Sequence, residues 1–193
     1  MKNTITLITL TTSLIACKAQ QQIYPLNTYY EDVPNYSYMK DLNNYLPQYI
    51  GTYKTTYQGN EITLYITQNN MELIDTRLGG RKYYQDVLHI KYIVKDIATG
   101  AMLESNQNPT DPKRNRIISI ATNDLDSNSL SLLYSGTTCG LGRGEIILKK
   151  INSTQINWSF WYEKQLLIQG ECPNYQSVKV YLPKTFDLIF TKQ

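Results

Sequence analysis

The chain has little of what most catalytic and metal sites are built from. Its 193 residues include one histidine, three cysteines and three phenylalanines. One histidine excludes a histidine-rich zinc site, and so few cysteines without neighbouring histidines supply too few ligands for a metal. No Gly-x-Ser-x-Gly turn marks a hydrolase nucleophile. His89 lies on the same face of a predicted strand as Lys91 and Lys95, so we expect it to face solvent. We therefore predict that the protein is not an enzyme and has no catalytic residues, metal or cofactor.

Long apolar runs and broad charged surfaces are also missing. The apolar stretch Ile5–Ala16 is about 12 residues long, whereas a membrane-spanning helix needs about 20. The formal net charge is only +3, and the densest basic spot, Lys113-Arg114 with Arg116, has an aspartate and two prolines beside it. Because nucleic-acid binding requires a broad basic face, we expect this spot to be a solvated loop and predict no nucleic-acid partner.

What the chain does have is a processing signal near its start. Leu14-Ile15-Ala16-Cys17 follows a positive charge at Lys2 and the short apolar stretch, and a small residue directly before a cysteine there is typical of a bacterial lipobox. The pattern predicts a signal peptide over residues 1–16 and lipid on Cys17. Two or more acyl chains hold a protein stably on a membrane. We therefore expect the mature protein in the bacterial cell envelope, lipid-anchored on the periplasmic side of the outer membrane.

The residues after Cys17 are polar and contain prolines. Lys18-Ala19-Gln20-Gln21-Gln22 precedes Tyr24-Pro25 and Val33-Pro34, and no alternating pattern runs through them. This composition is typical of a linker. We predict a flexible lipid-anchored tether over residues 17–36 and a single folded domain over residues 37–193.

Alternation of apolar and polar residues dominates the remaining chain. Ile62, Leu64 and Ile66 alternate with polar residues, as do Trp158 and Phe160, and this period is typical of antiparallel strands with one buried face. Turn residues separate the runs at hairpin spacing, for instance at Gln58-Gly59-Asn60, Asn69-Asn70 and Thr99-Gly100.

The pattern predicts an all-β fold of nine or ten strands. Because so many consecutive hairpins must protect their edges, we expect one antiparallel β-barrel, or a strongly curved sheet, from about Tyr49 to Gln193. The expected core includes Trp158, Phe160, Phe186 and Phe190. A short N-terminal helix is predicted over Tyr38–Leu46, with Ser37 as its N-cap and Pro47 after it. The unpatterned segment Ala98–Arg116 is predicted to be a long hairpin loop.

Two cysteines remain once Cys17 is lipidated, namely Cys139 and Cys172. In an oxidising envelope compartment such a pair favours a disulfide. A loop of this length is stabilised by about 3–4 kcal/mol in the chain-entropy model. The bond would connect the glycine-rich turn Gly140–Gly144 to the end of a predicted strand at Leu166–Gly170.

Two resemblances to known families are visible. Gly51-Thr52-Tyr53, opening the first strand after the predicted helix, is similar to the start of lipocalin-like barrels, with Tyr53 standing where those have Trp. Nearly the whole chain resembles an uncharacterised lipoprotein family of Bacteroidota, a domain of unknown function. The residues that carry this likeness are Cys-Lys-Ala-Gln at 17–20, Asp-Leu-Asn-Asn-Tyr-Leu at 41–46, Gly-Thr-Tyr-Lys at 51–54 and the terminal strand at 182–192. The resemblance implies an envelope location and a β-rich domain, and it implies no activity.

Two functions remain open from the sequence. Thirteen of the 17 tyrosines lie between Tyr24 and Tyr92, and together with the lipocalin-like start they favour binding of a small apolar or glycan ligand in the barrel or in a groove. The alternative is a structural or protein-interaction lipoprotein, because small barrels are commonly filled by their own side chains. No ligand-binding residue can be named, but an open interior would favour the first function and a packed interior the second.

Overall fold

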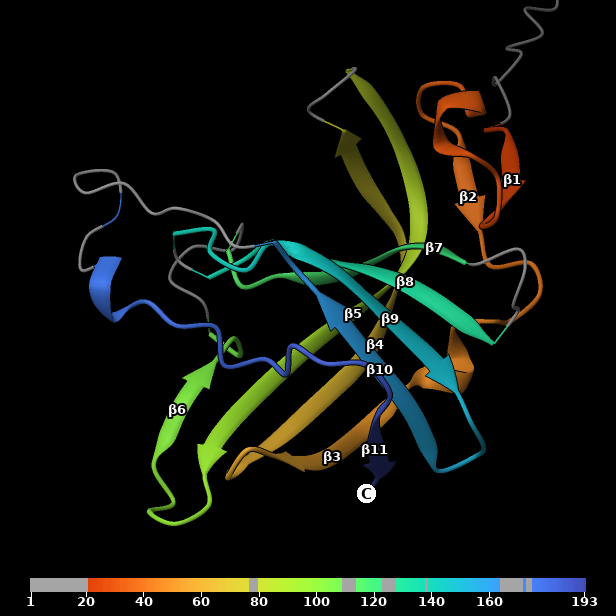
Figure 1. Ribbon diagram of the computed structural model, residues 1–193. Helices are drawn as coiled ribbons and strands as arrows, with labels where there is room; N and C mark the ends of the chain where they lie inside the picture. The colour runs from red at the N-terminus through yellow and green to blue at the C-terminus, as the bar shows by residue number, and fades with distance from the viewer. Residues whose placement is uncertain are drawn as a thin grey trace, which may run out of the picture.

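The structure is a computed structural model that describes residues 21–76, 80–108, 114–122, 128–137, 139–163, 172 and 175–193 (Figure 1). The strands of this part of the chain are β1 (Ile23–Pro25), β2 (Tyr38–Lys40), β3 (Gly51–Tyr57), β4 (Asn60–Thr76), β5 (Arg81–Asp96), β6 (Met102–Ser105), β7 (Ile117–Thr122), β8 (Ser129–Tyr134), β9 (Gly144–Lys150), β10 (Gln155–Trp161) and β11 (Leu188–Lys192). Three single 3-10 turns accompany them: η1 (Tyr30–Asp32), η2 (Pro47–Tyr49) and η3 (Tyr175–Ser177).

Eight of the strands close into an antiparallel barrel. They follow the order β5-β4-β3-β11-β10-β9-β8-β7, and β7 pairs back onto β5 through His89↔Ile118 and Ile90↔Ile117. Closure gives each strand of the ring a neighbour on both sides, which reduces the strand edge open to another chain. Beyond the β7 pairing, the later part of β5 pairs instead with β6. The predicted all-β barrel is confirmed.

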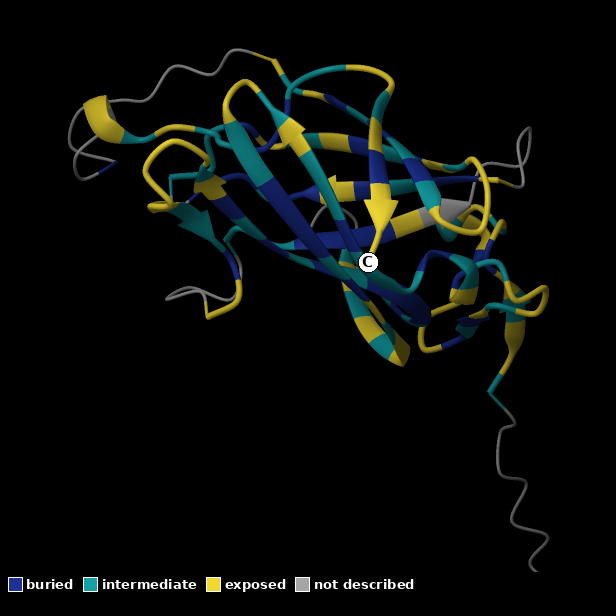
Figure 2. Ribbon diagram, turned by 90° about the horizontal axis from the view of Figure 1, so that it is seen from below, coloured by how far each residue is buried: buried dark blue, intermediate teal, exposed yellow. Residues whose placement is uncertain are grey.

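Aromatic side chains fill the barrel interior. Tyr53, Tyr92, Tyr134, Trp158, Phe160 and Phe190 come from five strands, and each is fully buried. Figure 2 shows the buried positions alternating with exposed ones along the strands. The Trp158 ring centroid lies 5.7 Å from that of Phe190 and 6.0 Å from that of Phe160, and its indole N–H donates to the Pro183 carbonyl at 3.0 Å. Trp158, Phe160 and Phe190 are therefore core residues, as the sequence predicts.

Phe186 is not a core residue, so that part of the prediction is wrong. Its side chain is 61% exposed and stacks on the exposed Trp161, with ring centroids 5.9 Å apart. The next residue, Asp187, has a φ of 60°, which interrupts the extended backbone before β11 begins at Leu188. The alternation that buries Phe190 therefore does not reach back to Phe186.

The predicted helix at Tyr38–Leu46 is also wrong. Tyr38–Lys40 forms β2, which pairs in parallel with β5. The Asp41 carboxylate then accepts hydrogen bonds from the backbone N–H groups of Tyr45 and Leu46, at 2.9 and 2.8 Å, and Asn44 has a φ of 55°. A side-chain acceptor and a left-handed residue favour a turn over a helix, so the segment turns instead of coiling.

Much of the predicted tether belongs to the folded structure. Leu26 and Val33 are 4% and 1% exposed and pack in the core. The Arg81 guanidinium donates to the Val33 carbonyl at 2.8 Å, and the Tyr38 N–H donates to the Gln22 carbonyl at 2.8 Å. Residues 21–36 are thus held against β2 and β5 rather than serving as a linker (Figure 1). Residues 17–20 of the predicted tether lie outside the described residues.

β4 and β5 form a long hairpin that extends beyond the barrel (Figure 1). A turn predicted at Asn69-Asn70 is instead a β-bulge, where the register shifts between Asn69 and Glu72. The buried Asp86 accepts hydrogen bonds there from the Met71 N–H and the Asp41 N–H, both at 3.0 Å, and from the Tyr38 hydroxyl. One carboxylate therefore fixes the bulge to β2.

The Cys139–Cys172 disulfide is present, with a Cα–Cα distance of 5.6 Å. The strand predicted at Leu166–Gly170 lies outside the described residues. The segment Ala98–Arg116, predicted to be a loop, contains the strand β6. The turn between β3 and β4 is confirmed: Gln58 and Gly59 both have positive φ, as a two-residue hairpin turn of type I′ requires.

Candidate binding site

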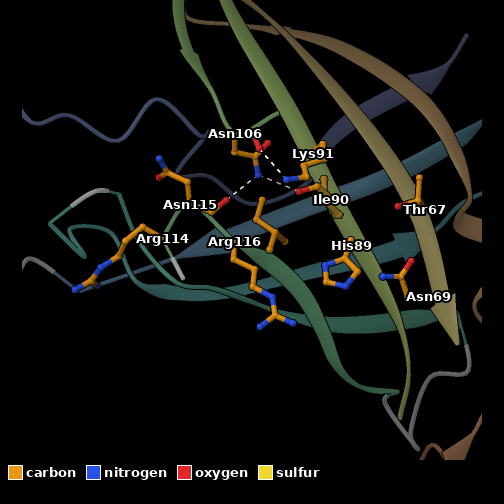
Figure 3. Close-up of a pocket in the computed structure, with 10 residues that line it drawn as sticks. Thr67, Asn69, His89, Ile90, Lys91, Asn106, Arg114, Asn115 and Arg116 are labelled. Carbon is orange, nitrogen blue, oxygen red and sulfur yellow. Dashed lines mark hydrogen bonds between the residues drawn. The ribbon is translucent and has the colours of Figure 1, made fainter. Parts of the chain in front are cut away.

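A hollow of about 330 Å³ opens on the outside of the barrel, where the strand paired with β5 changes from β7 to β6 (Figure 3). It is lined by Thr67 and Asn69 of β4, by His89, Ile90 and Lys91 of β5, by Asn106 after β6, and by Arg114, Asn115, Arg116 and Ile117 at the start of β7. His89 and Lys91 point outward because they alternate with the buried Ile90 and Tyr92. The volume is at the low end of the range for small-molecule sites, about 300–1,000 Å³.

Asn106 fixes the geometry of the hollow. It is 2% exposed, its side-chain N–H groups donate to the Ile90 carbonyl at 3.1 Å and the Asn115 carbonyl at 2.7 Å, and its side-chain oxygen accepts from the Tyr92 N–H. Its own carbonyl accepts from the Lys91 ammonium at 3.0 Å. A buried amide with all these partners joins β5 to the start of β7, and the dashed lines of Figure 3 show two of these bonds leaving its nitrogen.

Glu72 stands beside the hollow and orients two of its lining residues. One carboxylate oxygen lies 2.5 Å from His89 Nε2, and the other pairs with the Arg116 guanidinium. The register shifts between Asn69 and Glu72, so that Glu72 stands opposite Gln85 of β5, and its carboxylate reaches His89 from there. His89 lies on the outer face as predicted, but only 20% of its side chain is exposed. No local pattern indicates this pairing, because 17 residues separate Glu72 from His89.

The lining carries an excess of positive charge. Lys91, Arg114 and Arg116 contribute three cations, and none of the described lining residues carries a carboxylate. With the adjacent Glu72 counted and His89 taken as neutral, three positive charges less one leave two. Arg114 and Arg116 were expected in a solvated loop, but both are half-buried at the hollow. Lys113 lies outside the described residues.

The half-buried Glu104 of β6 stands opposite the buried Val94 of β5. The Tyr181 N–H donates to the Glu104 carboxylate at 3.4 Å. Burial raises the pKa of Glu104, although hydrogen bonds from Tyr92 and Tyr181 act in the opposite direction. The Tyr134 hydroxyl lies 3.5 Å from that of Tyr92 and donates to the Asn115 side chain at 3.0 Å, so polar contacts run from this interior region to the hollow.

A second hollow, of about 320 Å³, lies where the β3–β4 turn meets the segment before β11. Its lining residues are Tyr57, Gln58, Asn60, Tyr162, Val180, Tyr181, Leu182 and Lys184. The Lys184 ammonium lies over two aromatic rings, 4.1 Å from the Trp161 centroid and 4.4 Å from the Tyr162 centroid. This lysine is therefore already engaged by cation–π contacts.

The sequence-predicted sites are not brought together by the fold. Cys17 lies outside the described residues, and the Cys139–Cys172 bond is separate from the lining of either hollow. Within the described ranges, no three His, Cys, Asp or Glu side chains are grouped so that they could hold a metal ion. In the same part of the chain, no helix has the length and apolar character needed to cross a membrane.

The fold and the outer hollow define a class: a closed eight-stranded antiparallel barrel with a basic, amide-lined hollow on its outer face. All of the chain, residues 1–193, matches the model of a family described as a family of unknown function, DUF6705. The chain belongs to this family, which confirms the expected likeness to an uncharacterised family. No curated protein and no solved structure gives a significant match to it.

Proposed function

We propose that the mature chain is a lipid-anchored, non-catalytic protein of the bacterial envelope that binds its partner on the outside of a solid barrel. The lipobox at Leu14–Cys17 supports the anchor. The observation that carries the binding mode is the packed interior, where Trp158, Phe160 and Phe190 are fully buried against one another. This favours the alternative of an interaction protein over a carrier of an apolar ligand.

The end of the barrel where β9 and β11 finish, at Lys150 and Lys192, also argues against an apolar guest. The Lys150 ammonium lies 3.4 Å from the Tyr53 hydroxyl, and desolvation together with nearby Lys192 lowers the pKa of Lys150. Lys192 donates to the Ile50 carbonyl at 2.8 Å and lies 5.8 Å from the Tyr53 ring centroid. A lipid chain entering there would have to displace two amines from their partners, and burying an unpaired charge is costly.

Metabolic labelling tests the anchor. Labelled palmitate should enter the full-length chain and should be absent from Cys17→Ser. The double variant Cys139→Ser/Cys172→Ser, which keeps only Cys17 among the cysteines, is the matched control and should label like the wild type. Label in Cys17→Ser would end the proposal of an anchor. Fractionation of the membranes, followed by protease treatment of intact cells, checks the outer membrane and its periplasmic side.

Native mass spectrometry tests the solid barrel. Protein extracted from its own cells should have the mass of the mature chain with its Cys17 lipid and no further bound lipid. A second, stoichiometric lipid that persists in Cys17→Ser would show that the interior accepts a ligand, and the carrier function would then replace the one proposed.

A further inference from the structure

We propose that the outer hollow between β5 and β7 is a binding site for an anionic sugar, one monosaccharide unit that bears a carboxylate or a phosphate. The inference rests on the proposed function in one respect only, that the ligand meets the outside of the barrel. It does not depend on the lipid at Cys17, because every lining residue belongs to the barrel or to the segments joined to it.

Charge selects an anion. Lys91, Arg114 and Arg116 all line one hollow, and they come from two strand regions that are adjacent only because β7 closes the barrel onto β5. The Lys91 ammonium uses one donor on the Asn106 carbonyl, and an ammonium has three. Two donors therefore remain for a ligand. Three cations lining one small hollow form a basic spot, which fits a small anion better than a nucleic acid, whose binding requires a broad basic face.

The neutral lining selects a hydroxylated ligand. Thr67, Asn69 and Asn115 add a hydroxyl and two amides to the lining, and such groups can donate to and accept from sugar hydroxyls. Ile90 and Ile117 supply an apolar element against which a sugar ring can pack. A volume of about 330 Å³ accommodates one such unit and leaves the rest of a longer glycan in solvent.

The site is organised before any ligand arrives. Glu72 pairs with Arg116 and with His89 from beside the hollow, so both side chains are held in place. Asn106 is buried and fixes the backbone of Ile90 and Asn115. Preorganised groups lose little conformational freedom on binding, which raises affinity.

Calorimetric titration of the mature protein with matched sugars tests the ligand class. The probes are glucuronate, glucose 6-phosphate, glucose and inorganic phosphate. We expect at least one of the two anionic sugars to bind at least about tenfold more tightly than glucose, and more tightly than phosphate alone. The affinity should fall as salt is raised, because salt screens charge. Preference between the two anionic sugars distinguishes a carboxylated from a phosphorylated ligand.

Two lysines on the outer face of β5 give a matched pair of variants. Lys91→Gln should weaken binding of the preferred sugar by about tenfold or more, because it removes a cation from the lining. Lys95→Gln changes an exposed lysine four residues further along the same face, outside the lining, and should leave binding within about twofold of the wild type. Circular dichroism should show that both variants are folded.

Three results would overturn the inference: glucose binding as tightly as the anionic sugars, equal losses in Lys91→Gln and Lys95→Gln, or no binding of any probe at about 10 mM. Inorganic phosphate binding as tightly as glucose 6-phosphate would exclude recognition of the sugar. Because Cys17→Ser should bind the sugar unchanged, failure of this site and failure of the lipid anchor give separate results.

Discussion

Strand β10 carries both tryptophans of the chain in opposite environments, and this pair tests the packed barrel. Trp158 is fully buried, whereas Trp161 is 55% exposed. The two residues are three positions apart, so their side chains point to opposite faces of the strand. Replacing each with alanine compares the inside of the barrel with its outside within one strand.

The expected costs differ several-fold. Trp158→Ala removes a buried indole that contacts Phe160 and Phe190, and it leaves the Pro183 carbonyl without its donor. Burial loss and the resulting cavity amount to about 3–5 kcal/mol, and the unsatisfied carbonyl places the value near the upper end. Trp161→Ala loses an exposed stack on Phe186 and a cation–π contact with Lys184, which together contribute about 1 kcal/mol.

Urea unfolding followed by circular dichroism measures both free energies of unfolding. A cavity shaped like the lost side chain binds small apolar molecules, so indole should raise the unfolding midpoint of Trp158→Ala and leave that of Trp161→Ala unchanged. The reasoning about a solid interior is refuted if the two variants lose similar stability, or if indole stabilises the wild type as much as Trp158→Ala.

Three further predictions concern contacts that hold the barrel together. Cys139→Ser should lower the free energy of unfolding by about 3–4 kcal/mol under oxidising conditions, and intact-mass measurement should show that reduction adds two hydrogens to the wild type only. Burial raises the pKa of Glu104, so between its unfolded and folded pKa values the folded state binds more protons than the unfolded chain, and stability falls as pH rises through that window. Glu104→Gln should therefore raise the melting temperature at neutral pH and have little effect in acid. A variant that is stabilised in acid and unchanged at neutral pH would contradict the burial argument. Asp86→Ala should cost about 2–4 kcal/mol, because it removes the acceptor for the Tyr38 hydroxyl and two backbone N–H groups, and limited proteolysis should then cut first near β2.

The sequence predicts the strands correctly where local alternation of apolar and polar residues, or a two-residue turn, is enough to determine the structure. Ile62, Leu64 and Ile66 alternate with polar residues and are buried, and Gln58-Gly59 forms the expected hairpin turn. Tyr38–Leu46 was mispredicted because the helical pattern competes with the Asp41 carboxylate, whose backbone partners can be identified only in the folded chain. Phe186 was mispredicted because one left-handed residue, Asp187, interrupts the alternation.

The candidate site could not be predicted because its parts are distant in sequence. Thr67, His89, Asn106 and Arg114 belong to four segments that meet only when β7 pairs with β5. Each segment taken alone has an ordinary explanation as a solvated strand or loop. The nearest signal of the hollow in the sequence is the basic spot at Arg114 and Arg116. It becomes part of a site only because β7, which follows it, pairs with β5.

The position of β1 restricts how far the barrel can stand from a bilayer. β1 begins at Ile23, and an extended chain spans at most about 3.3–3.6 Å per residue, so Cys17 lies within roughly 20 Å of it. A lipid on Cys17 would therefore hold the β1 side of the molecule close to the membrane surface. The β3–β4 turn and the C-terminus lie at the opposite end of the molecule (Figure 1). The sides of the barrel and the end that carries the β3–β4 turn would then be the surfaces open to a partner.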